Sequence, residues 1–382
     1  MEGTERLQTP ELTVIDERGL MDIPFLLLTL LLVAIGVIMM FSASYARALY
    51  KEGSSTYYFA RQGGFALAGV AAMWLISRIN YQWWRVASIP IMAAAIVLLI
   101  LVPVIGVGRS ETGANRWIRL FGISFQPSEL AKLAVVLCFA AMISFYRDRM
   151  RTFRYGILPF AGILVAIAGL LFLEPHLSAT LIIFATGAVM MFLGGVKLRW
   201  FALGAGLVGL VLFIYLSTQG YASARITAWR DPFSDQSDKG YQIIQSLYAI
   251  GSGGMMGLGL GRSRQKYLYL PEEHNDYLFP IVCEELGFVG ASLVLLLFAL
   301  LVFRGYWIAI HARDRFGSLV AAGITTLVLL QVFLNVGVVT NLFPATGISL
   351  PFFSYGGTAL LVQLAEMGII LNISRSNRSN LI

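Results

Sequence analysis

The chain is dominated by long runs of apolar residues separated by short polar breaks. A run of about 20 apolar residues is long enough to cross the hydrocarbon core of a bilayer as one helix. The pattern therefore predicts an all-α, polytopic membrane protein of ten transmembrane helices. The predicted spans are residues 22–43, 58–77, 86–107, 128–146, 155–173, 177–195, 199–217, 276–303, 318–341 and 353–373.

The polar segments divide the chain into a membrane domain and two tails. Residues 1–21 are expected to form an N-terminal tail, residues 22–374 one ten-helix domain, and residues 375–382 a C-terminal tail. The loop between the seventh and eighth spans, about residues 218–275, is long, and long loops in compact folds are usually functional or disordered. Lys and Arg gather in the short loops of one face, most densely at residues 147–154. The positive-inside rule then places both termini in the cytoplasm and the long loop outside.

Composition agrees with a membrane protein. Hydrophobic residues make up 58% of the chain and charged residues only 13%, whereas soluble domains are about a quarter charged. The net charge is +7, but the basic residues are scattered among the loops. This distribution argues against nucleic-acid binding and favours anionic lipid headgroups or an anionic lipid substrate. Cys138 and Cys283 both fall in apolar runs, so no disulfide framework or cysteine metal site is predicted.

Ionisable residues are concentrated where the long loop meets the eighth span. His274 and Asp276 lie at this junction, and Glu284 and Glu285 lie about two helical turns deeper. A carboxylate at the centre of a membrane helix costs about 2.5–3.5 kcal/mol on insertion scales, so each needs a partner, a water-filled cavity or a role. Asp276 can be explained equally well as a catalytic group or as a helix N-cap or first-turn acid. Glu284 and Glu285 are expected to pair with buried cations such as Lys132.

Two outer segments carry further charge. Glu129 and Lys132 are three residues apart at a helix start, so they share one helical face. They form either a structural ion pair or a cation presented to a substrate phosphate, and both interpretations stay open. Arg116 and Arg119 lie in an outer loop that is apolar enough to dip into the membrane. An arginine there favours a bidentate phosphate contact over simple solvation.

The long loop also has internal structure. Ile244, Leu247 and Tyr248 share one helical face, which predicts a short interfacial helix. The glycine-rich residues 251–261 predict tight turns, because a dinucleotide fingerprint requires a βαβ unit that a helical bundle lacks. In the last span, Glu366 is a lone ionisable residue that requires a partner not identifiable from the sequence.

Several long segments together resemble one family, the SEDS proteins of bacterial cell-wall synthesis (FtsW, RodA and SpoVE). The resemblance covers nearly the whole chain and is nearer the FtsW/SpoVE branch. The matching segments are FSASYA at residues 41–46, NRWIRLFGISFQPSELAKLA at 115–134, KGYQIIQSLYAIGSGGMMGLGLG at 239–261, SRQKYLYLPEEHNDYLFPIVCEELGFVG at 263–290, NVGVVTNLFPATGISLPFFSYGG at 335–357 and ILNISR at 370–375.

The resemblance implies a peptidoglycan glycosyltransferase in the bacterial cytoplasmic membrane that polymerises lipid II during cell division or related septal or spore wall synthesis. It implies a class B penicillin-binding protein transpeptidase and other division-complex membrane proteins as partners. Any cofactor would be a divalent cation, Mg or Mn, with no metal ligands assigned. The resemblance narrows the role of catalytic base to Asp276. It also assigns substrate binding to a set of polar residues: Arg116, Glu129, Lys132, Lys239 and His274.

The chain departs from the family pattern at two polar motifs. Asn275 replaces the usual threonine before the aspartate, and Glu174-Pro175-His176 stands where a QPD-like motif is common. Two other functions remain to be separated by experiment. One is a lipid II flippase, which would need polar groups along the whole membrane path. The other is a non-catalytic scaffold of the wall-synthesis complex.

Overall fold

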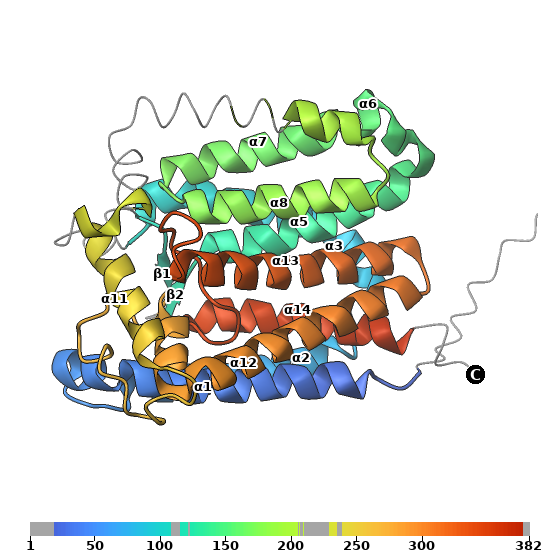
Figure 1. The fold of residues 1–382 in the computed structure, drawn as a ribbon. Coiled ribbons are helices and arrows are strands. Elements are labelled where there is room, and N and C mark those ends of the chain that lie inside the picture. Colours follow the sequence, from blue (N-terminus) through green and yellow to red (C-terminus); the bar gives the residue numbers. More distant parts are fainter. Residues whose placement is uncertain are drawn as a thin grey trace, which may run out of the picture.

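The computed structural model describes residues 19–107, 115–120, 123–204, 206, 209, 229–234 and 239–376. Its long helices run side by side, as Figure 1 shows. They are α1 (Ile23–Glu52), α2 (Tyr57–Ile76), α3 (Gln82–Ile105), α5 (Pro127–Tyr146), α7 (Leu158–Leu173), α8 (Leu177–Leu193), α12 (Leu278–His311), α13 (Arg315–Val339) and α14 (Gly357–Arg375). Shorter elements are the strands β1 (Ile118–Leu120) and β2 (Ile123–Phe125), the 3-10 turns η1 (Arg147–Arg151) and η2 (Pro232–Ser234), and the helices α6 (Phe153–Gly156) and α11 (Lys239–Ser252).

The predicted fold class, an all-α polytopic membrane protein, is confirmed. In the described part of the chain, eight helices are long and apolar enough to cross a membrane, and α8 is a shorter apolar helix. The seventh predicted span, residues 199–217, lies mostly outside the described residues, and so do residues 218–228 and 235–238 of the loop that follows it. The count of ten helices and the loop of residues 218–275 therefore stay predictions.

Burial separates central helices from peripheral ones. α5, α13 and α14 are buried over most of their apolar windows (78%, 72% and 78% of the residues), whereas α2, α3 and α12 bury less than a third of theirs (22%, 28% and 28%). Large apolar side chains point outward from the peripheral helices, for example Leu67, Val86 and Ile310, each at least 75% exposed. Apolar surface on this scale marks contact with a membrane or a partner rather than with water.

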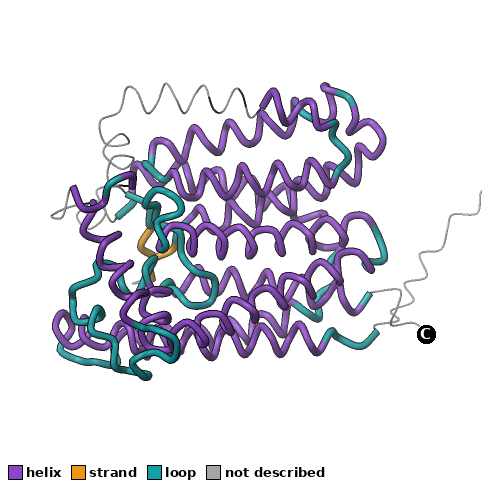
Figure 2. Tube along the Cα trace, in the orientation of Figure 1, coloured by secondary structure: helices purple, strands orange, loops and turns teal. Residues whose placement is uncertain are grey.

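The hairpin of β1 and β2, the helix α11 and the longest described loops gather at one end of the bundle, as Figures 1 and 2 show. β1 and β2 form an antiparallel hairpin in which Ile118 pairs with Phe125, although the sequence predicted only a loop. The predicted short helix is present as α11, and its position at the membrane interface stays a prediction. Ile244 is buried, as are Ile243 and Ala249, whereas Tyr248 is 51% exposed and points away from the bundle. This end of the bundle carries the polar chemistry.

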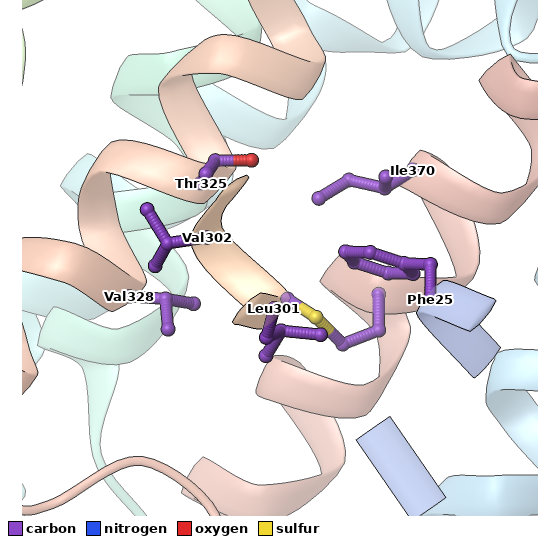
Figure 3. Close-up of a pocket in the computed structure, with 7 residues that line it drawn as sticks. Phe25, Leu301, Val302, Thr325, Val328 and Ile370 are labelled. Carbon is purple, nitrogen blue, oxygen red and sulfur yellow. The ribbon is translucent and has the colours of Figure 1, made fainter. Parts of the chain in front are cut away.

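A small pocket lies elsewhere, between α1, α12, α13 and α14 (Figure 3). Its volume of about 10 Å³ is close to the smallest space that holds one water molecule. Phe25 and Leu301 line it, together with other apolar side chains and the Thr325 hydroxyl. Leu301 lies 23 residues along α12 from its start at Leu278, so at about 1.5 Å per residue the pocket is remote from the polar end. It is an apolar packing gap, not a substrate site.

Candidate active site at the start of α12

Asp276 lies immediately before α12, where the long loop ends. The N-cap residue of α12 is Tyr277, and no side chain caps this helix. The helix-cap explanation of Asp276 is therefore wrong, and its partly buried carboxylate is available for other interactions.

The main chain around Asp276 is held by hydrogen bonds from distant segments. Asn335 of α13 donates from Nδ2 to the carbonyl oxygen of Asp276 at 2.8 Å. The Ser354 hydroxyl donates to the carbonyl of Asn275 at 2.7 Å, and the Tyr355 amide donates to the carbonyl of His274 at 2.8 Å. Three consecutive carbonyls are thus satisfied from α13 and from the segment that leads into α14, which fixes the position of Asp276.

The environment of Asp276 raises the pKa of its carboxyl to about 7. Burial is the largest cause, because it disfavours the charged form. The like charge of Glu272 raises the pKa further, and the positive charge of Arg116 opposes both effects. A carboxylate with a pKa near neutrality is well suited to accept a proton at physiological pH.

Arg116 connects Asp276 to the break between α7 and α8. Its Nη2 donates to the carbonyl oxygen of Pro175 at 2.7 Å. Burial raises the pKa of Glu174 to about 8, opposed in part by Arg116. Burial, with Arg116 and Lys132, lowers the pKa of His176 to about 3. At neutral pH the His176 imidazole is therefore neutral, and the positive charge beside residues 174–176 comes from Arg116.

The predicted pairing of Glu129 with Lys132 is confirmed. Lys132 Nζ lies 2.8 Å from Glu129 Oε2, and both side chains are buried near the start of α5. Lys132 also interacts electrostatically with His176 and with Glu366 of α14. Lys132 is therefore the cation that acts favourably on Glu366, whereas the like charge of Glu129 opposes it. Electrostatic interactions thus connect Asp276 with Arg116 and connect Lys132 with Glu366 inside the bundle.

The other two predicted substrate-binding residues are placed differently. The His274 ring lies against the rings of Tyr58 and Tyr355, with centroids 5.2 and 5.8 Å away. Burial, with Arg47 and Lys51, lowers the pKa of His274 to about 3, so its ring is neutral. Lys239 begins α11, but its side chain lies outside the described residues.

The prediction that Glu284 and Glu285 pair with Lys132 is wrong. The prediction that both carboxylates have a structural role is right. Glu285 forms an ion pair with Lys266 at 3.0 Å, not with Lys132. Glu284 accepts hydrogen bonds from the hydroxyls of Ser252 and Ser263 and from the main chain at Arg264. Both carboxylates therefore fasten the glycine-rich loop to α12.

No group of three or more His, Cys, Asp or Glu side chains is arranged to hold a metal ion within the residues that the structure describes. The chemistry proposed below is written without a metal-dependent step. A requirement for Mg or Mn stays a prediction.

Comparison with known proteins identifies the family. The family described as "Cell cycle protein" (FtsW, RodA and SpoVE) matches residues 23–379. The chain belongs to the FtsW/RodA/SpoVE family. Stage V sporulation protein E of Bacillus subtilis is 43% identical over 358 residues, which are 94% of this chain and 98% of that protein. A probable peptidoglycan glycosyltransferase FtsW of Trichlorobacter lovleyi is 41% identical over 354 residues, 92% of this chain and 93% of that one.

Solved structures share the fold. A chain from a study of polymerization and crosslinking by a peptidoglycan synthase complex superposes with a TM-score of 0.77 at 29% identity, covering 93% of this chain and 98% of that one. RodA, the rod shape determining protein of Thermus thermophilus, superposes with a TM-score of 0.69 at 27% identity, covering 94% and 98%. The resemblance to the FtsW/RodA/SpoVE family is confirmed.

Sequence reasoning did not single out several residues that surround Asp276. Asn335 and Tyr355 lie within residues 335–357, where only the family resemblance carried a functional prediction, and Arg47 lies four residues beyond the first predicted span. Arg47 forms a bidentate pair with the buried Glu273, with Nε and Nη2 each 2.7 Å from one carboxylate oxygen. These contacts join residues far apart in the chain, and no local pattern signals them.

Proposed function

We propose that this chain is a peptidoglycan glycosyltransferase that polymerises lipid II into glycan strands at the outer face of the bacterial cytoplasmic membrane, in septal or spore wall synthesis. The observation that carries the proposal is the Asp276 carboxylate, which has a pKa of about 7 and interacts electrostatically with Arg116. Relatives named as probable peptidoglycan glycosyltransferases support the substrate class.

In the proposed reaction, the sugar 4-hydroxyl of the acceptor attacks the anomeric carbon of the donor. A carbon–oxygen bond forms there as the bond to undecaprenyl diphosphate breaks, and the diphosphate leaves with the electron pair. The hydroxyl proton passes to the Asp276 carboxylate, and general base catalysis of this kind typically contributes about 10²–10⁴-fold. Arg116 interacts electrostatically with Asp276 and would stabilise the departing diphosphate.

The arrangement also accounts for a lipid-linked substrate. Asp276 lies at the end of the bundle, where α12 begins, so the sugars can meet the loops while the lipid tail stays beside the exposed apolar helices. This orientation places both termini in the cytoplasm. Substrate binding by Glu129, Lys132, Lys239 and His274 belongs to the same proposal.

The proposed partner is a class B penicillin-binding protein transpeptidase. A glycan polymerase needs an enzyme that crosslinks its product, and one structural relative comes from a peptidoglycan synthase complex in which polymerization and crosslinking are coordinated. Other membrane proteins of the division complex are proposed partners on the family resemblance alone.

The test uses the purified full chain with lipid II, with and without the transpeptidase. We expect Asp276→Asn to insert and fold normally but to form no glycan strands. Glu52→Gln is the matched control, because Glu52 is an exposed carboxylate at the end of α1, the helix whose Arg47 pairs with Glu273. Wild-type activity in Asp276→Asn would refute the role of Asp276.

Two further arms separate the other functions. If the wild type exposes the lipid II headgroup on the opposite face of liposomes but forms no glycan strands, the chain is a flippase. Neither flipping nor product would indicate a scaffold. A chelator arm tests the divalent cation, because polymerisation that is lost with chelator and restored by Mg or Mn would establish the requirement.

A further inference from the structure

The segment between α13 and α14 is fastened to Asp276 by one buried side chain. Asn335 is 1% exposed, and its Nδ2 donates to two main-chain carbonyls, those of Asp276 at 2.8 Å and Ile348 at 2.6 Å. A single amide group therefore joins α13, Asp276 and the segment that leads to α14. Loss of this donor would leave two carbonyls unsatisfied in a largely buried place.

Gly347, the residue before Ile348, lies directly against the carboxylate. A Cβ atom built on Gly347 would lie 2.7 Å from Asp276 Oδ2 and 3.7 Å from its Cγ, and no other side chain or main chain would lie within 4 Å of it. Gly347 is exposed, and its backbone is outside the left-handed region. Neither backbone conformation nor packing therefore demands glycine here. What a side chain would obstruct is the carboxylate alone.

We propose that residues 346–350 form a second wall of the catalytic site, which Asn335 positions against Asp276 and in which Gly347 leaves the carboxylate open to the acceptor sugar. The proposal deepens the proposed function and rests on Asp276 as general base. Asn335 acts as a positioning residue through the main chain of Asp276. Gly347 acts by the absence of a side chain, which leaves the approach to Oδ2 unobstructed.

The first test is Gly347→Ala, measured by polymerisation kinetics on lipid II. We expect kcat to fall by at least about tenfold with little change in KM, since a displacement of about 1 Å at a reacting group can cost about 10²-fold. The control is Gly251→Ala, because Gly251 is an exposed glycine of α11 whose added Cβ would meet nothing within 4 Å. Unchanged kcat in Gly347→Ala would overturn the proposal.

The second test is a double-mutant cycle between Asn335→Ala and Gly347→Ala. Without Asn335 the wall can move away from the carboxylate, so the added methyl group should cost less kcat than it does in the wild-type background. Such coupling is expected only for residues that act on one another. A merely structural Asn335 would lower thermal stability but give multiplicative losses of kcat, and that outcome would overturn its positioning role.

A third measurement does not depend on polymerisation. The carboxyls are labelled with a carbodiimide and an amine, and labelling of Asp276 is compared with labelling of the exposed Glu272 by mass spectrometry. We expect Gly347→Ala to lower the Asp276-to-Glu272 ratio and Gly251→Ala to leave it unchanged. A wild type that makes no glycan, together with a lower labelling ratio in Gly347→Ala, would refute the proposed function. The proposal that residues 346–350 lie against the Asp276 carboxylate would still hold. An unchanged ratio overturns the wall itself.

Discussion

Lys266, five residues after the glycine-rich loop, and Glu285 of α12 form an ion pair in the protein interior, with Nζ 3.0 Å from Oε1. Ser42 of α1 donates to both oxygens of the same carboxylate, at 2.7 and 2.8 Å. The pair lies two residues before Gly287, where the backbone of α12 leaves the helical conformation. Because the break frees main-chain carbonyls, the amides of Leu258 and Gly259 donate to Glu284 and Glu285 there. The glycine-rich loop thus supplies the main-chain donors that α12 lacks at this break.

The Lys266–Glu285 pair should contribute strongly to stability. We expect Lys266→Met to cost about 3–5 kcal/mol, because removal of one partner leaves a buried charge uncompensated. The measurement is the melting temperature of the purified chain in detergent. Arg304→Met is the control, because the Arg304–Asp22 pair has a 33% exposed arginine side chain and should contribute only about 0–1 kcal/mol. Equal losses in the two variants would contradict the prediction.

The contact between the glycine-rich loop and α12 should not tolerate a side chain at Gly257. Its φ is +79°, and an added Cβ would lie 2.2 Å from the carbonyl oxygen of Glu285. Gly261 has a φ of +77° with nothing within 4 Å of an added Cβ. Both alanine variants carry left-handed strain of about 1–3 kcal/mol, so their difference isolates the contact. We expect Gly257→Ala to melt at a clearly lower temperature than Gly261→Ala, and equal melting temperatures would argue against the close contact.

The helices could be predicted because an apolar run of membrane length is a signal carried by consecutive residues. Their ends were less predictable. α1 continues to Glu52, nine residues beyond its predicted end at residue 43, since hydropathy marks where the chain leaves the apolar layer and not where a helix stops. The Glu129–Lys132 pair was predictable for a similar reason, because residues three apart in a helix are neighbours.

The surroundings of Asp276 could not be predicted from one sequence. The position of Asp276 in its motif was visible, but the donors that hold its main chain come from the segment after α12, such as Asn335, 59 residues away. Glu285 was matched with the wrong cation because Lys132 and Lys266 are both lysines in or near apolar segments, and their local sequence does not separate them. The tertiary arrangement alone places Lys266 beside Glu285.

The Glu129–Lys132 pair can be tested for the two roles that the sequence left open. Lys132→Met alone leaves Glu129 buried without its cation, so both stability and polymerisation should fall. In the double variant Lys132→Met with Glu129→Met, stability should recover, because replacement of a buried ion pair by apolar residues is often neutral or stabilising. We expect polymerisation not to recover, since the cation would still be missing. Recovery of both would show that the pair is purely structural.

The pH dependence of polymerisation should follow the pKa of Asp276. A general base must be deprotonated, and its pKa is about 7, so the rate should fall as the pH decreases below neutrality. Glu272 raises this pKa by like charge, so Glu272→Gln should lower it and move the acidic limb of the rate profile to lower pH. Arg116 opposes this rise in the pKa of Asp276, so Arg116→Met should raise the pKa further. The activity that remains in this variant should therefore have its acidic limb at higher pH. Glu52→Gln is the control and should leave the limb unmoved. Shifts in the same direction for Glu272→Gln and Arg116→Met would contradict the assignment of this limb to Asp276, because the two residues carry opposite charge.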